Sequence, residues 1–148
     1  MAYLIGLVLV ACFIFRLFLF FLRRSRLSFA TMHRIDRMEG ADFEAYLAVK
    51  LREKGYKVTF TPATGDQGAD LIIEKRRQKT AVQAKRYEGK IGNSAVQEVI
   101  AGMAYYDCDH AMVITNSEFT PAAVKLAEKC NVELWDREML RKKFHIAN

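Results

Sequence analysis

An aspartate, a glutamine and a lysine occupy positions of the sequence where polar side chains are costly. Asp70 comes directly before the apolar run 71–73, and Gln83 and Lys85 alternate with apolar residues in the run 81–85. A carboxylate at the start of a buried strand needs a polar partner, because removing it from water is unfavourable. The three side chains therefore indicate a polar site inside a hydrophobic sheet.

A hairpin would bring these three side chains together. With a turn centred between Arg77 and Gln78, Asp70 lies opposite Lys85, and Gln83 is the diagonal neighbour of Asp70. Opposed side chains are about 5 Å apart and diagonal ones about 7–8 Å. An even shift of register keeps all three on one face, whereas an odd shift would replace Gln83 and Lys85 by apolar neighbours. The shared polar face is therefore predicted whatever the even register.

This combination of groups suits a divalent cation and a phosphate. A carboxylate and a neutral oxygen ligand begin a Mg²⁺ site, since Mg²⁺ binds a few protein oxygens and keeps several waters. A lysine beside them can hold or deprotonate a metal-bound water and offset charge on a phosphate. Glu44, on the helical strip of Leu47 and Leu51, is a third candidate ligand. The alternative is that Asp70 and Lys85 form only a structural cross-strand ion pair.

The elements that must position these residues follow from hydrophobic periodicity and turn formers. The expected caps are Ser94 with Gln97 for one helix, Thr120 with Pro121 for the next, and Asp136 for the last. Because helices and strands alternate as α-β-β-β-α-β-α-β-α, the fold class is α/β, a sandwich with a mixed central sheet flanked by helices. The elements are a helix at 41–56, strands at 56–60, 69–74 and 80–86, a helix from 94, a strand at 111–116, a helix at 121–130, a strand at 132–135 and a helix at 137–144.

The first 22 residues are apolar except for Arg16. As a helix they would be roughly 33 Å long, enough to cross a hydrocarbon core of about 30 Å. Basic residues follow rather than precede the run, so the positive-inside rule places the rest of the chain in the cytoplasm. We predict a single-pass protein of the cell inner membrane; the alternative is a buried helix of a soluble domain. The predicted divisions are a transmembrane helix at 1–22, a basic juxtamembrane linker at 23–38 and a soluble domain at 39–148.

The net charge of +6 and the isoelectric point near 9.3 favour an anionic partner. Nucleic acid and the headgroups of a lipid bilayer both qualify, and the linker could lie on lipid or contact DNA. The three cysteines, Cys12, Cys108 and Cys130, are widely spaced and form no CxxC pair. This pattern argues against a disulfide framework and against a thiolate zinc site.

Four blocks of sequence carry a family resemblance. In order, "TGDQGADLI", "VQAKRY", "VQEVIAG" and "MVITNSEFT" resemble the Mrr-type restriction endonuclease family of the PD-(D/E)xK nuclease superfamily. The resemblance covers roughly residues 38 to 140 and implies a restriction-endonuclease-like sandwich. It makes Asp70 a metal ligand and Lys85 the catalytic lysine, while Gln83 stands where most of the superfamily has an acid. Gln97 matches a further polar position of the family.

The resemblance implies Mg²⁺-dependent hydrolysis of DNA phosphodiester bonds, with Mn²⁺ as a substitute and no small-molecule cofactor. Asp70 and Gln83 would hold the ion, and Glu44 would complete its shell through water. Lys85 would position the attacking water. The residues expected to contact DNA, mostly through its backbone, are Lys75, Arg76, Arg77, Lys79, Arg86, Tyr87, Lys90 and Gln97.

A second function stays open beside the nuclease. A neutral amide at position 83 is a weaker Mg²⁺ ligand than a carboxylate, so the chain could be a catalytically weak or inactive DNA-binding module tethered at the membrane. Lys85 and Glu44 favour the nuclease, because binding alone calls for neither. Junction-resolving activity would require a homodimer.

Overall fold

The computed structural model describes residues 6, 10–16, 30–62, 65 and 67–147. The chain divides into two compact units, which are Met1–Ala30 and Thr31–Asn148. Most of the predicted transmembrane helix at 1–22 lies outside the described residues. Within the described residues, no helix is both long enough and apolar enough to span a membrane. The fold is that of the second unit.

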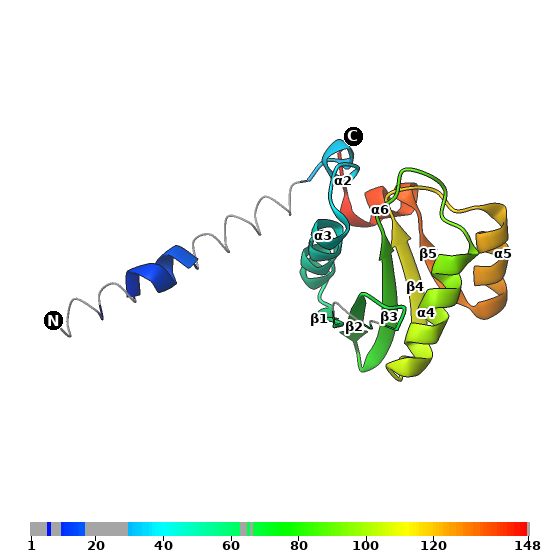
Figure 1. The fold of residues 1–148 in the computed structure, drawn as a ribbon, viewed down its shortest axis with the longest axis horizontal. Coiled ribbons are helices and arrows are strands. Elements are labelled where there is room, and N and C mark those ends of the chain that lie inside the picture. The colour runs from blue at the N-terminus through cyan, green and yellow to red at the C-terminus, as the bar shows by residue number, and fades with distance from the viewer. Residues whose placement is uncertain (1–5, 7–9, 17–29, 63–64, 66, 148) are drawn as a thin grey trace. The chain divides into compact units, whose positions relative to one another are not determined.

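The second unit contains the predicted succession of elements after one short extra helix (Figure 1). The sheet order is β1-β2-β3-β4-β5, with β1 to β3 antiparallel and β3 to β5 parallel. The predicted mixed sheet flanked by helices is therefore confirmed. The helices are α2 (Met32–Ile35), α3 (Gly40–Glu53), α4 (Asn93–Tyr105), α5 (Pro121–Cys130) and α6 (Arg137–Phe144), and the strands are β1 (Lys57–Phe60), β2 (Leu71–Lys75), β3 (Gln78–Lys85), β4 (His110–Thr115) and β5 (Val132–Trp135).

Helices cover both faces of the sheet (Figure 1). On one face α4 and α5 pack on small apolar side chains, and α3 and α6 cover the other with aromatic residues. There the Phe144 ring lies edge-on to Tyr46 and Trp135, at 6.2 and 5.7 Å between centroids. The α4 face is built from Ala81, Ala95, Val96, Val99, Ala111, Val113, Ala123 and Ala127.

The end of the predicted linker belongs to the folded unit. Met32, Ile35 and Met38 are buried, and the Met32 N–H donates to the carbonyl of Ala147 at 3.3 Å. The basic residues between them hide this apolar spacing in the sequence. The compact unit thus begins before residue 39, the start that the sequence predicts for the domain.

Two of the three predicted helix caps are present. The Thr120 hydroxyl accepts the Ala123 N–H, with Pro121 as first residue of α5, and Asp136 accepts the Met139 N–H at 2.8 Å. The prediction for α4 was wrong: this helix begins at Asn93, and its cap Gly92 makes no side-chain bond. Backbone pairing of Ile91 with the Glu118–Thr120 strip fixes the chain just before the helix, so Ser94 lies inside it.

The register of the β2–β3 hairpin differs from the predicted one by two residues. Leu71 pairs with Val82 and Lys75 with Gln78, so Asp70 faces Gln83 and not Lys85. The turn consists of Arg76 and Arg77 alone, with φ of 53° and 66°. Such two-residue turns match the twist of the flanking strands, which favours the tighter hairpin. Because the shift is even, the predicted polar face is retained.

This turn holds two arginines in a backbone conformation that Asn-Gly adopts more readily. Replacing Arg76 by Asn and Arg77 by Gly should therefore raise the free energy of unfolding by about 1–2 kcal/mol. Urea unfolding followed by the fluorescence of the single tryptophan, Trp135, measures this change. Replacing both arginines by lysine keeps the charge and the strain, and should bring no gain. An unchanged midpoint for the Asn-Gly variant would contradict the expectation.

Candidate active site

Asp70 and Gln83 form the centre of the site, on the face of the sheet that α4 covers. The Asp70 Oδ2 accepts the Gln83 Nε2 at 2.8 Å and the backbone N–H of Ala84 at 2.7 Å. The Asp70 N–H in turn donates to the Val82 carbonyl at 2.9 Å. The end of β3 thus supplies the polar partners that the carboxylate requires.

Gln83 has a buried oxygen without a partner. Gln83 is only 4% exposed, and no described residue donates a hydrogen bond to its Oε1. Exchanging the amide oxygen and nitrogen would set two oxygens against each other at Asp70, so the bond to Asp70 fixes the amide orientation. An unsatisfied buried acceptor costs about 1–3 kcal/mol. A cation bound at Oε1 would remove this cost.

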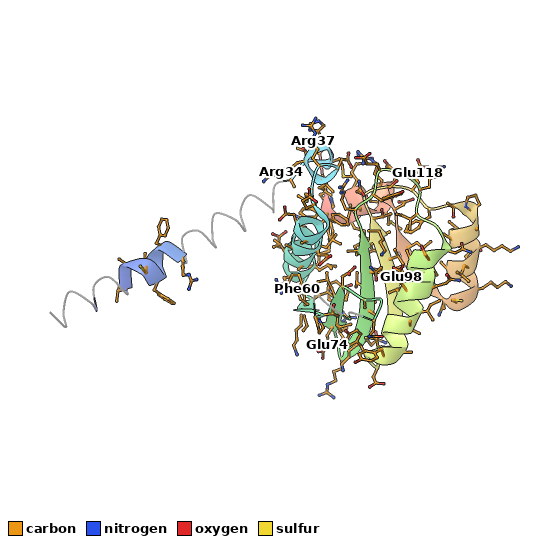
Figure 2. All side chains as sticks on the ribbon, in the orientation of Figure 1. Arg34, Arg37, Phe60, Glu74, Glu98 and Glu118 are labelled. Atoms are coloured by element: carbon orange, nitrogen blue, oxygen red, sulfur yellow. The ribbon has the colours of Figure 1, made fainter. Side chains whose placement is uncertain are left out.

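Lys85 pairs with a residue that sequence reasoning missed. Its Nζ lies 2.7 Å from Oε2 of Glu98, with side-chain exposures of 34% and 43%. Figure 2 shows Glu98 on α4. The predicted Gln97 is the neighbouring residue and is exposed. A sequence signal for Glu98 existed: position 98 flanks the buried stripe of Ala95 and Val99, but its partner becomes visible only when α4 is placed on the sheet.

Two glycines bring α4 against the loop that leads to Asp70. Gly68 has a φ of +89°, and a Cβ there would overlap the carbonyl oxygen of Glu98. A Cβ on Gly102 would lie 2.8 Å from the Cβ of Ala69. Any larger residue at these positions would push the loop from the helix. The close contact therefore sets the position of Asp70 relative to Glu98.

Glu44 comes from the other side of the sheet. It is half-buried on α3, which packs against β1, β2 and β3 on the face opposite α4. A ligand role for Glu44 would require its carboxylate to reach the Asp70 group around the end of the sheet. This role remains a prediction.

The donor set fits a hydrated hard cation. Across the described part of the chain, no three His, Cys, Asp or Glu side chains gather as a metal-binding group. The Asp70 carboxylate and the Gln83 amide oxygen are nevertheless oxygen donors from adjacent strands, and Mg²⁺ commonly takes only one or two protein carboxylates and keeps several waters. The residues present therefore suit Mg²⁺ or Mn²⁺ better than a metal that requires a full protein cage.

Half of the predicted DNA-contacting residues lie at the far tip of the hairpin. They are exposed, and the six-residue strand separation from Asp70 to Arg76 corresponds to about 20 Å. Lys75 is held by the α3 end, since its Nζ donates to the Lys54 carbonyl at 2.8 Å and lies 4.7 Å from the centre of the Tyr56 ring. The tip group comprises Lys75, Arg76, Arg77 and Lys79.

The other group follows the end of β3, next to the site. Tyr87 is 58% exposed, and Lys90 is exposed and pairs with Glu118 at 2.9 Å. Arg86 is more buried, and its Nη1 lies 3.5 Å from the Asp36 carbonyl. Tyr87 and Lys90, but not Arg86, line a cleft of about 460 Å³ at the ends of β3 and β4. Its other lining residues are Asp36, Glu88, Gly89, Asn116, Ser117, Glu118 and Arg137.

An ion pair ties the segment after α2 to this cleft. Arg137 donates both terminal nitrogens to the Asp36 carboxylate, at 2.6 and 3.0 Å, and the Asn116 Nδ2 donates to the same group at 3.0 Å. The hydrogen bond from Arg137, reinforced by that from Asn116, lowers the pKa of Asp36 in spite of its partial burial. The folded domain therefore prefers this carboxylate charged.

Asp36→Asn should lower the free energy of unfolding at neutral pH but not in strong acid. A carboxyl whose pKa is lower in the folded state stabilises it above about pH 4 and loses this contribution as pH falls through the folded-state pKa. Because Asp36 is partly exposed, we expect a loss of about 1 kcal/mol at pH 7 and convergence with wild type in strong acid, measured by urea unfolding across pH. Glu128→Gln, at an exposed position of α5, is the control and should leave stability unchanged. A pH-independent loss would contradict this account of Asp36.

Comparisons with known proteins agree with this fold. The Mrr_cat family model, described as restriction endonuclease, matches residues 35–144. A search of curated proteins found no match. In fold the chain is similar to the DNA modification-dependent restriction endonuclease AspBHI, with a TM-score of 0.60 and 17% identity over 82% of this chain and 34% of that protein. It is also similar to AF1548, a protein of unknown function, with a TM-score of 0.55 and 17% identity over 64% of this chain and 56% of that one.

Proposed function

The chain belongs to the Mrr_cat family of restriction endonucleases, and on this premise we propose that it is a membrane-anchored, Mg²⁺-dependent DNA endonuclease. Membership makes the folded unit a nuclease domain. The observation that supports metal dependence is the buried, unpartnered Oε1 of Gln83 beside the Asp70 carboxylate. Mn²⁺ is expected to replace Mg²⁺, since both accept oxygen ligands.

Asp70 and Gln83 are the residues that would hold the cation. A bound Mg²⁺ supplies Lewis-acid stabilisation of the phosphate and of the leaving oxygen. Asp70 contributes the negative charge, and the donors from Gln83 and Ala84 keep its Oδ2 in place. Lys85 would donate from its ammonium group to the attacking water and to a phosphate oxygen. Glu44 would complete the shell of the cation through a water molecule.

DNA would lie across the end of β3 and reach the hairpin tip. Tyr87 and Lys90 are exposed beside the site, and the basic tip is about 20 Å away along the strand. Contacts of this kind are made to the phosphate backbone and carry little sequence information. We therefore expect DNA affinity to fall steeply as salt is raised.

The membrane anchor is proposed from the sequence. Residues 1–22 are apolar except for Arg16, and Arg23, Arg24 and Arg26 follow them, which favours a single-pass helix with the nuclease domain in the cytoplasm. The full chain should then sediment with membranes and resist extraction by alkaline carbonate. A variant without residues 1–22 should appear in the soluble fraction. A full chain found in the soluble fraction would overturn the anchor alone.

The nuclease is tested with the full chain in mild detergent, on supercoiled plasmid and linear duplex, in Mg²⁺, Mn²⁺ or EDTA. An endonuclease nicks and then linearises the plasmid when either metal is present, and leaves it intact in EDTA. Degradation of the linear duplex alone would indicate an exonuclease. The second candidate function, DNA binding without cleavage, rests on the neutral amide at position 83; retarded but uncut DNA in both metals would favour it.

A further inference from the structure

The proposed cation site has an unusual charge balance. Asp70 carries one negative charge and Gln83 none, while Lys85 brings a positive charge to the same face of the sheet. These three groups sum to zero and would attract a divalent cation weakly. A further carboxylate is needed if the site is to favour a cation.

Glu98 is joined to the site by two independent contacts. Its side chain holds the Lys85 Nζ at 2.7 Å, and its backbone carbonyl lies directly against Gly68, two residues before Asp70. An ordinary surface ion pair would need only the first contact. The second means that α4 cannot move at Glu98 without moving the loop that carries Asp70.

We propose that Glu98 supplies the second negative charge of the cation site. This inference rests on the proposed metal-dependent nuclease and deepens it. Glu98 neutralises the Lys85 ammonium, so the charge of Asp70 remains available to the cation, and it also holds Lys85 on the α4 side of the site. Glu98 need not touch the metal: its effect is electrostatic and acts from the adjacent helix.

The first test measures cation binding without DNA. The full chain in detergent is titrated with Mn²⁺, and free Mn²⁺ is followed by electron paramagnetic resonance. Glu98→Gln keeps the side-chain shape and removes the charge, and should weaken Mn²⁺ binding by about 10- to 100-fold, as outer-shell substitutions typically do. Glu128→Gln, the same substitution at an exposed position of α5, is the matched control and should bind Mn²⁺ like wild type.

A compensating substitution separates charge from structure. Gln83 Oε1 is the buried atom that the cation would satisfy, so a charge placed there acts at the shortest range. In the Glu98→Gln background, Gln83→Glu should restore Mn²⁺ affinity. Melting curves of the variants check that they remain folded, since Glu98 is 43% exposed and its pair contributes little stability.

The outcomes distinguish this inference from the function on which it rests. Unchanged Mn²⁺ affinity in Glu98→Gln, while wild type binds Mn²⁺ and cuts DNA, overturns the role of Glu98 alone. A loss of affinity that Gln83→Glu does not restore also overturns it, because the effect would then come from displaced structure. A wild-type chain that neither binds Mn²⁺ nor cuts DNA would overturn the proposed function itself.

Discussion

Asp70→Asn should abolish metal-dependent cleavage while leaving the domain folded. Asparagine can still accept the hydrogen bonds that Gln83 and the Ala84 N–H donate to Asp70, but it carries no charge. Loss of the charged ligand should reduce the cleavage rate by about a thousandfold or more, equivalent to about 4 kcal/mol of transition-state stabilisation. Plasmid nicking at saturating Mg²⁺ measures the effect.

Lys85→Ala provides the comparison for this result. It should also cut slowly, but its Mn²⁺ affinity should not fall, because Lys85 is a cation and not a ligand. Asp70→Asn should lose both cleavage and Mn²⁺ binding. Cleavage that survives Asp70→Asn would show that the catalytic site lies elsewhere in the domain.

Gly68→Ala should produce the largest loss of stability. The residue has a left-handed φ of +89°, and a methyl group would overlap the Glu98 carbonyl, which is helix backbone and cannot turn aside. Backbone strain and overpacking each cost about 1–3 kcal/mol, so we expect a total of about 3 kcal/mol or more. The urea midpoint, followed by Trp135 fluorescence, reports this loss.

Gly40→Ala is the matched control for this change. Gly40 is the first residue of α3, and nothing lies within 4 Å of the position of an added Cβ. Alanine is the better helix former, so stability should stay constant or rise slightly. If Gly68→Ala behaved like Gly40→Ala, the contact between the Asp70 loop and α4 would not be as close as the structure shows.

The polar face of the hairpin could be predicted from the sequence because alternation survives any even shift of register. Gln83 and Lys85 therefore fall on the α4 side in both the predicted and the observed pairing. The register itself depends on the turn, and Arg76 and Arg77 are not residue types that indicate a two-residue turn. The order of elements was predictable because Thr120, Pro121 and Asp136 mark helix starts chemically.

The contacts between elements were the part that periodicity could not predict. The pairing of Lys85 with Glu98 needs α4 to be docked on the sheet, and the docking depends on Gly68 and Gly102, whose close contacts involve backbone atoms. The pairing of Asp36 with Arg137 joins residues 101 positions apart. Propensity and spacing describe neighbours along the chain, so such pairs appear only in the folded structure.

The site itself is tested most directly by locating a bound cation. Crystals of the full chain grown with Mn²⁺ and measured near the manganese absorption edge give an anomalous map of its position. We expect a peak for a manganese ion that is coordinated by the Gln83 Oε1 and the Asp70 carboxylate, with Lys85 still paired to Glu98. A map with no peak at Gln83, or with Mn²⁺ bound by other residues, would contradict the proposed active site.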